Sequence, residues 1–218
     1  MAWKRSRVRI PYAPPFFMKP QKYKNLHELI PHLPTHSYVE DGKLAEPITL
    51  IILGNRRLIR KVFKKAGWYL AVPISLKTLF ESGLAAAFNR SYRTGPMRSL
   101  FVSGKKHKLG FERPTRSDTY RRRHHLRLWD TEFMLYKKPV WVGMLSYDRS
   151  FGLAKGSLSP THHISAALNS EENFLADNLD IKTPQYVHLS KPEEGIISIG
   201  DPYVWDGEAL LINLADKK

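Results

Sequence analysis

The sequence predicts a single α+β domain, in which a largely antiparallel mixed sheet of about six to eight strands carries about three packed helices. Three observations support this fold class. Short apolar runs of strand length recur along the chain. Two segments in the first half place their apolar residues at helical spacing. No run approaches the roughly 20 apolar residues that a membrane-spanning helix requires.

The first half of the domain is expected to alternate strand and helix. Residues 48–53 form a short apolar run with β-branched members, which indicates a buried strand. Asn55 is a suitable helix N-cap and Gly67 stands where a C-cap glycine is expected, so a helix is predicted over 56–66. A second helix, with apolar residues on one face, is predicted over 76–88.

The second half is expected to consist mainly of strands. Two long strands joined by a polar loop are predicted within 120–149, and the second of them is apolar on both faces, which places it centrally in the sheet. Residues 100–103 and 109–112 are predicted to form a hairpin, and residues 161–164 a short strand or an ordered loop. A helix capped by Asn169 or Ser170 is predicted next. Two strands, at 185–189 and 208–214, are predicted to follow it, linked by a Gly/Pro/Asp loop.

The amino-acid composition favours some classes of binding partner over others. A net charge of +15 and a pI of about 10.0 favour phosphates, nucleic acid or an acidic membrane surface, although a merely soluble basic surface is the simpler explanation. The chain contains no cysteine, which excludes disulfides and cysteine-ligated zinc. With 42% hydrophobic residues, it can form a substantial core.

Residues 1–46 are predicted to form an N-terminal extension, and 47–216 the domain. Back-translation of residues 8–11 resembles the T-arm of a transfer RNA gene, so 1–17 are interpreted as a mis-assigned start with Met18 as the first residue. The alternative is a real arm that binds nucleic acid or lipid. No apolar segment follows the basic start, so no signal peptide is predicted, and a cytoplasmic or peripheral membrane location is expected.

Charged and imidazole side chains gather at one end of the two long strands. Strand alternation divides the first strand into two faces. One face carries Arg123, His125, Arg127 and Trp129. The other carries Arg122, His124, Leu126 and Leu128, and its two leucines favour it as the core side. Since adjacent residues point to opposite sides, at most one histidine of each pair should reach a common site.

The candidate site combines acid–base groups with cations that could clamp a phosphate. The candidate catalytic residues are His124, His125, His162, His163 and Asp148, and the candidate ligand-binding residues are Arg123, Arg127, Tyr147 and Arg149. The competing interpretation is that the histidines form hydrogen bonds in the core and the arginines form a solvated face. Two imidazoles with Asp148 could also bind a divalent metal, but the neighbouring arginines would repel a cation, so the cofactor is left open.

Three ordered motifs carry a resemblance to a known family. They are RHHLRLW (123–129), VWVG (140–143) with YDR (147–149), and THHI (161–164), and they strongly resemble the LssY C-terminal domain family. Residues 47–50, 66–68 and 73–76 fit as well, so the resemblance covers about 46–214. The family's domain is often found in bacterial membrane proteins behind phosphatase-like and DedA-like transmembrane regions. No such region is predicted here, so the domain is expected to work free or with a separate partner.

The resemblance implies an envelope or phospholipid connection without specifying a reaction. The first functional hypothesis is a site that binds an anionic, phosphate-bearing ligand and hydrolyses a phosphoester. The alternative is a non-catalytic module that docks to an anionic membrane surface, to lipid headgroups, or to an envelope membrane protein. Nucleic acid is not expected, because the aromatic residues resemble core residues rather than stacking platforms. The oligomeric state is not predicted.

Overall fold

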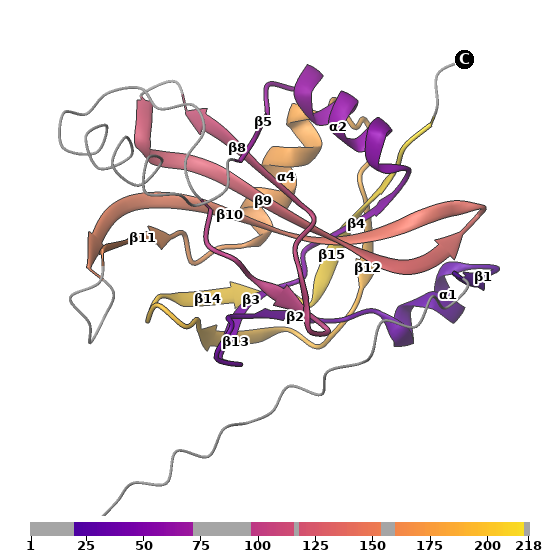
Figure 1. The fold of residues 1–218 in the computed structure, drawn as a ribbon, viewed down its shortest axis with the longest axis horizontal. Coiled ribbons are helices and arrows are strands. Elements are labelled where there is room, and N and C mark those ends of the chain that lie inside the picture. The colour runs from indigo at the N-terminus through magenta and orange to yellow at the C-terminus, as the bar shows by residue number, and fades with distance from the viewer. Residues whose placement is uncertain (1–19, 72–96, 116–117, 154–159, 216–218) are drawn as a thin grey trace, which may run out of the picture.

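The computed structural model describes residues 20–71, 97–115, 118–153 and 160–215. Within them the chain forms the predicted α+β domain, built on a nine-stranded main sheet that is somewhat larger than expected (Figure 1). The main path of that sheet runs through β12 (Gln185–His188), β15 (Glu208–Asn213), β4 (Leu50–Leu53), β10 (Lys138–Leu153), β9 (Asp118–Leu135), β8 (Leu109–Thr115) and β5 (Tyr69–Leu70). Two further strands join it at the sides, β1 (Gln21–Tyr23) beside β9 and β11 (Pro160–Ile164) beside β10.

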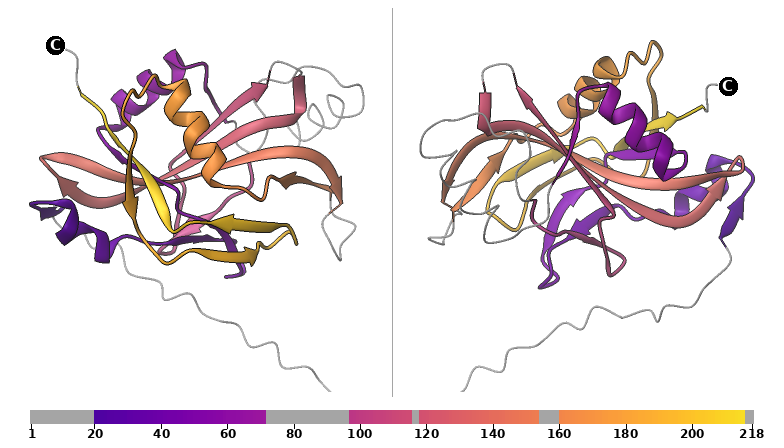
Figure 2. Two further views of the ribbon diagram at one scale, coloured as in Figure 1. Left: turned by 180° about the vertical axis from the view of Figure 1, so that it is seen from behind. Right: turned by 45° about the horizontal axis from the view of Figure 1, so that its top comes forward.

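Smaller elements cover the two faces of the main sheet. A second, four-stranded sheet has the order β3 (Leu44–Pro47), β2 (His36–Tyr38), β6 (Phe101–Val102) and β7 (Lys105–Lys106), and a separate hairpin is formed by β13 (Glu193–Ile196) and β14 (Pro202–Trp205). The described helices are α1 (Leu26–Leu29), the 3-10 turn η1 (Ile30–His32), α2 (Arg56–Lys65) and α4 (Asn169–Asn178). Figure 2 shows α2 and α4 on one side of the main sheet and the strands β2, β3, β13 and β14 on the other.

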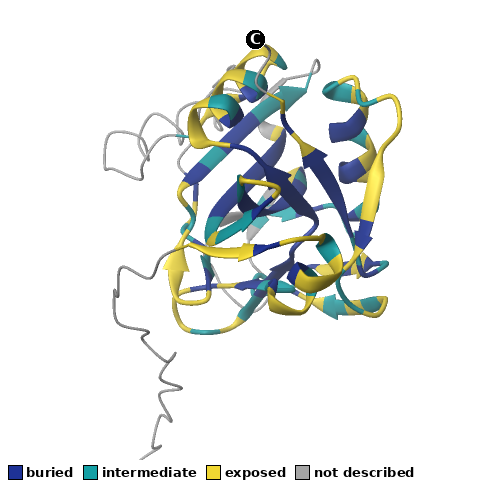
Figure 3. Cartoon of the chain, turned by 90° about the vertical axis from the view of Figure 1, so that its right-hand side faces the viewer, coloured by how far each residue is buried: buried dark blue, intermediate teal, exposed yellow. Residues whose placement is uncertain are grey.

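The long hairpin of β9 and β10 is the centre of the molecule. Its turn, Tyr136 and Lys137, has φ values of 51° and 64°, the left-handed pair that a two-residue type I′ turn requires. On its other side, β10 pairs antiparallel with β4, so the prediction of a central position for this strand is confirmed. Buried residues are concentrated in these central strands (Figure 3).

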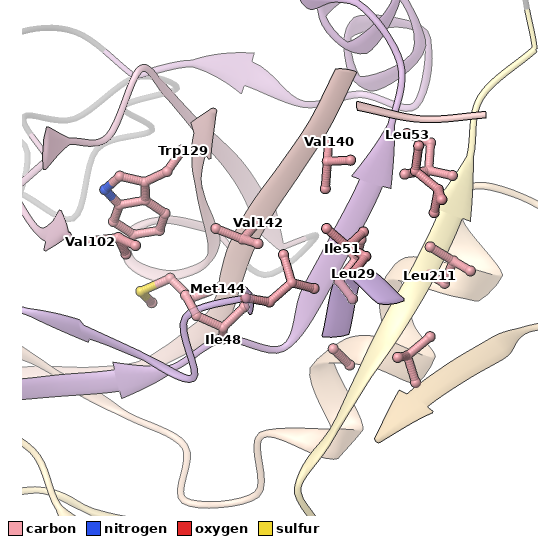
Figure 4. Packing of buried hydrophobic residues seen from close by; sticks show 14 of the residues in the cluster. Leu29, Ile48, Ile51, Leu53, Val102, Trp129, Val140, Val142, Met144 and Leu211 are labelled. Atoms are coloured by element: carbon pink, nitrogen blue, oxygen red, sulfur yellow. The ribbon is translucent and has the colours of Figure 1, made fainter. Parts of the chain in front are cut away.

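Both faces of β9 are buried over residues 123–129, whereas the sequence predicted only one core face. Leu126 and Leu128 pack with Ile59 and Phe63 of α2 and with Leu175 of α4. The opposite face is covered by the second sheet and α1, and Figure 4 shows Trp129, Val142 and Met144 in one layer with Ile48 and Val102. Arg123, His125 and Arg127 share that second face, and each of them is at most 9% exposed.

Helix α2 has the ends that the sequence predicted. The Asn55 side chain accepts a hydrogen bond from the Leu58 N–H at 2.8 Å, which caps the first turn. Gly67 adopts φ +82°, a conformation in which glycine avoids a steric cost. Helix α4 also forms where it was expected, but its N-cap position is Leu168, so neither Asn169 nor Ser170 caps it.

Two predicted connections were wrong. Residues 100–103 and 109–112 do not pair, because β6 pairs with β7 and β2 while β8 crosses to β9. The segment expected to be a Gly/Pro/Asp loop contains the β13–β14 hairpin, whose Tyr203 and Trp205 are buried. The helix predicted over 76–88 lies outside the described residues.

Residues 20–46, assigned to an extension from the sequence, supply β1, α1, β2 and β3. Their side chains Leu29, Leu33 and Val39 are buried in the same hydrophobic cluster as Trp129. The domain boundary at residue 46 and the start at Met18 stay predictions. In the part of the chain that the structure describes, no helix is long and apolar enough to cross a membrane.

Candidate functional site

The predicted site lies where β8, β9 and β10 run side by side, away from the Tyr136–Lys137 turn. His125 is paired in register with Ser146 of β10 and with Glu112 of β8, and Arg123 is paired with Asp148. Six buried ionisable residues of this region interact on the face that the second sheet covers, and we call them the charged cluster: Glu46, Glu112, Arg123, His125, Arg127 and Asp148.

His125 lies between two carboxylates of the charged cluster. Its Nε2 is 2.5 Å from Asp148 Oδ2, and its Nδ1 is 3.7 Å from Glu112 Oε1. His125 is 9% exposed and Asp148 is 3% exposed. A buried imidazole held by a carboxylate has one fixed orientation, which is the arrangement that general acid–base catalysis uses.

Arg123 and Glu112 form the most deeply buried ion pair among the described residues. Arg123 Nη1 donates to Glu112 Oε2 at 2.8 Å, and both side chains are at most 2% exposed. The pair links β8 to β9, and removing one partner would be costly because both side chains are buried. Glu112 therefore contacts both Arg123 and His125.

Arg127 is buried without a close carboxylate. Its Nε donates to the Arg98 carbonyl at 3.3 Å, but in the described part of the chain no carboxylate lies within ion-pair distance of its guanidinium. Burial lowers the pKa of Arg127, while the more distant charges of Glu46, Asp148 and Glu112 oppose that shift. Among the described carboxylates, those that offset the positive charge of Arg127 all lie beyond ion-pair distance.

Glu46, at the end of β3, reaches the same region from the second sheet. Burial raises its pKa, Arg127 lowers it, and Asp148 raises it further. Its Oε2 has no hydrogen-bond partner among the described residues. The protonated form of Glu46 is therefore favoured relative to an exposed glutamate.

His124 points to the opposite face of the sheet. Its Nδ1 is 2.6 Å from Glu171 Oε2 of α4, and its ring stacks on Phe174 with centroids 3.7 Å apart. The Tyr147 ring lies 4.9 Å from the His124 ring. These two predicted site residues are thus separated from the charged cluster by the sheet itself.

The second histidine pair belongs to β11, beside β10. His163 Nδ1 lies 2.8 Å from Asp201 Oδ1, and the other oxygen of Asp201 accepts the Ile164 N–H at 2.9 Å. His162 is paired in register with Phe151, but its side chain lies outside what the structure describes. Arg149 follows Asp148 on β10 and is exposed.

The structure therefore brings four of the predicted site residues together, namely Arg123, His125, Arg127 and Asp148. The catalytic and binding roles assigned to them stay predictions. Sequence reasoning missed four carboxylates near the predicted site residues. Glu112 lies beside Arg123 and His125, and Glu46 acts on Arg127 at longer range, whereas Glu171 pairs with His124 and Asp201 with His163. One signal was available for Glu112, because a charged residue inside an apolar strand segment must find a partner when it is buried.

A metal site is not evident in the described residues. No three His, Asp or Glu side chains of this part are grouped so that they could hold a metal ion. The question of a cofactor therefore stays as open as the sequence left it.

A comparison with protein-family models assigns the chain to a family. The family model described as LssY C-terminus matches residues 30–209, so this chain belongs to the LssY C-terminal family. The search of curated proteins found no match, and neither did the search of solved structures.

Proposed function

We propose that this member of the LssY C-terminal family binds an anionic, phosphate-bearing ligand at the charged cluster and hydrolyses a phosphoester there. The observation that carries the proposal is the state of Arg127, a buried guanidinium with no described carboxylate at ion-pair distance. A phosphate offers the paired oxygen acceptors that match the guanidinium fork. Binding would compensate a positive charge that the described carboxylates balance only from beyond ion-pair distance.

The three carboxyl groups nearest in charge effect to Arg127 would each repel a bound phosphate less than a free carboxylate would. Glu46, whose pKa is raised by burial, carries less negative charge than an ordinary glutamate and would repel a phosphate less. Glu112 is already neutralised by Arg123 at 2.8 Å. Asp148 is engaged with His125 at 2.5 Å. Arg127 is therefore the residue of the charged cluster that would attract an anionic ligand.

His125 supplies the acid–base group of the proposed hydrolysis. A water oxygen would attack phosphorus while the phosphorus–oxygen bond to the alcohol breaks, and His125 would take the proton from the attacking water. Glu46, in its protonated form, would return a proton to the leaving oxygen. Asp148 would hold the imidazole in orientation and stabilise its charged form.

The test measures binding of inorganic phosphate by calorimetry and hydrolysis of p-nitrophenyl phosphate on the same sample. Arg127→Lys keeps the charge but loses the fork, and should weaken phosphate binding by about 10- to 100-fold. His125→Gln should lower turnover by about 100-fold or more and change binding much less.

Two matched controls lie on the other face of the sheet. Arg113→Lys alters a guanidinium that donates to the Ala66 carbonyl, and His124→Gln alters the histidine that pairs with Glu171. Both controls should keep binding and turnover. Wild-type protein that binds no phosphate would contradict the proposal. Binding without turnover would support the non-catalytic alternative.

A further inference from the structure

Helix α2 and strand β5 enclose a strongly basic pocket on the face of the sheet opposite the charged cluster. Its volume is about 770 Å³. One wall is the outer side of α2, which contributes the cations Arg56, Arg57, Arg60, Lys61 and Lys64. All five side chains are exposed, whereas Ile59 and Phe63 of the same helix point inward and are fully buried.

The charge pattern of α2 opposes the stability of the helix. Its sequence RRLIRKVFKK contains six basic residues and no acidic one. Residues three and four positions apart are neighbours on a helix, so pairs such as Arg56–Arg60 and Arg57–Lys61 repel each other. Arg56 and Arg57 also lie in the first turn, where the helix dipole disfavours positive charge.

No described carboxylate relieves this repulsion. Among the residues that the structure describes, none of the α2 cations forms an ion pair with an Asp or Glu side chain. The stripe of cations extends over about two helical turns. A single small anion could not contact all of it, but a dense array of anionic groups could.

The opposite wall of the pocket determines what kind of anion fits. Tyr69 and Leu70 of β5 are 38% and 37% exposed and lie next to the cations. Trp68 and Phe111 also line the pocket but are at most 2% exposed, so neither ring is free to stack on a nucleic-acid base. The accessible apolar groups are thus one tyrosine ring and one aliphatic side chain, a pair suited to the boundary between lipid headgroups and acyl chains.

We propose that α2 and β5 form a docking surface for a membrane that contains anionic phospholipids. Phosphate groups in the lipid surface would neutralise the α2 cations, while Tyr69 and Leu70 would insert at the level of the headgroups. The inference goes beyond the proposed hydrolysis, because it concerns different residues on the other face of the main sheet. It follows from charge complementarity together with the exposed apolar pair.

The experiment measures cosedimentation of the full chain with vesicles of phosphatidylcholine, alone or mixed with phosphatidylglycerol. Wild-type protein should bind the mixed vesicles, and binding should weaken steeply as salt screens the charges. Each basic side chain near an anionic surface contributes about fivefold in affinity, so the triple variant Arg57→Gln/Arg60→Gln/Lys61→Gln should bind about 100-fold more weakly.

A control variant changes the net charge equally elsewhere. Lys22→Gln/Lys24→Gln/Lys191→Gln removes three exposed cations outside the pocket and should bind within a few-fold of wild type. The α2 triple variant should also be no less stable than wild type, since it relieves repulsion within the helix. The double variant Tyr69→Ser/Leu70→Ser should weaken binding in a way that persists at high salt, because its contribution is apolar.

Other occupants of the surface give distinct results. If single-stranded oligonucleotide binds through α2 while the mixed vesicles do not, the proposal is wrong and the surface is a nucleic-acid site. Displacement from vesicles by millimolar inorganic phosphate would overturn it in favour of a free phosphate ligand. Equal vesicle binding by the α2 triple variant and the control would also overturn it. Arg127→Lys should bind vesicles normally, so failure of the phosphate site and failure of docking are distinguishable.

Discussion

The buried carboxyl group of Glu172 makes the stability of the folded protein depend on pH. It lies in the first turn of α4, is 1% exposed, and its Oε1 has no hydrogen-bond partner among the described residues. Burial raises its pKa from 4.5 to about 9, with smaller contributions from the negative charges of Asp206 and Glu208. The favourable position of an acid near a helix N-terminus is therefore outweighed by the cost of desolvating it.

The direction of the pH effect follows from this shift. The folded state keeps a proton that the unfolded chain loses above pH 4.5, so the free energy of unfolding falls as pH rises from about 4.5 towards about 9. Glu172→Gln should flatten this decline and raise the melting temperature at pH 8. Thermal unfolding across that range checks it.

The neighbouring residue provides the comparison for this prediction. Glu171→Gln weakens the contact with His124 at 2.6 Å and should therefore lower stability instead of raising it. A wild-type melting temperature that does not decline between pH 5 and pH 8, or one that declines equally in Glu172→Gln, would contradict the assignment of this pH dependence to Glu172.

At the scale of elements, the β9–β10 pairing depends on a close approach at Gly143. A Cβ at this position would lie 2.5 Å from Leu128 Cδ2 and 3.0 Å from the Arg127 carbonyl oxygen. Leu128 is fully buried and the carbonyl belongs to the strand backbone, so neither can move freely. A glycine in a strand interior is thus explained here by steric contact.

Gly143→Ala should accordingly lower the free energy of unfolding by about 1–3 kcal/mol through overpacking. Urea unfolding followed by circular dichroism measures the loss. Gly54→Ala serves as the comparison, since the three atoms nearest to its Cβ would all belong to the Leu214 side chain, at 3.2 Å or more, and it should cost less. Equal losses in both variants would show that the contact with β9 is not the cause.

At the scale of the whole molecule, the net charge of +15 implies substantial self-repulsion in the folded state. Salt screens exposed charges much more than buried pairs such as Arg123–Glu112. Raising NaCl from about 0.05 to about 0.5 M should therefore raise the melting temperature by several degrees.

Differential scanning calorimetry at several salt concentrations checks this expectation. The α2 triple variant removes three of the crowded charges and should show a weaker dependence on salt than wild type. A melting temperature that falls with added salt would mean that attractive surface pairs, such as Lys105–Glu132, outweigh the repulsion.

The sequence by itself determined the features that depend on local spacing. The ends of α2 follow from Asn55 and Gly67, whose roles require only neighbouring residues. The period of two in a strand separates His124 from His125, as the structure confirms through Glu171 on one face and Asp148 on the other. The α+β class followed from the same local patterns.

Only the tertiary structure decided which distant residues meet. Glu112 joins His125 because β8 pairs with β9, and Glu46 reaches Arg127 from β3 of the second sheet, and no local pattern encodes either contact. The predicted hairpin of 100–103 with 109–112 failed for the same reason, since pairing of Leu109 with Leu128 of β9 replaced the local contact. Local spacing thus determines how an element forms and which way its side chains point, whereas the partners of buried charges depend on long-range packing.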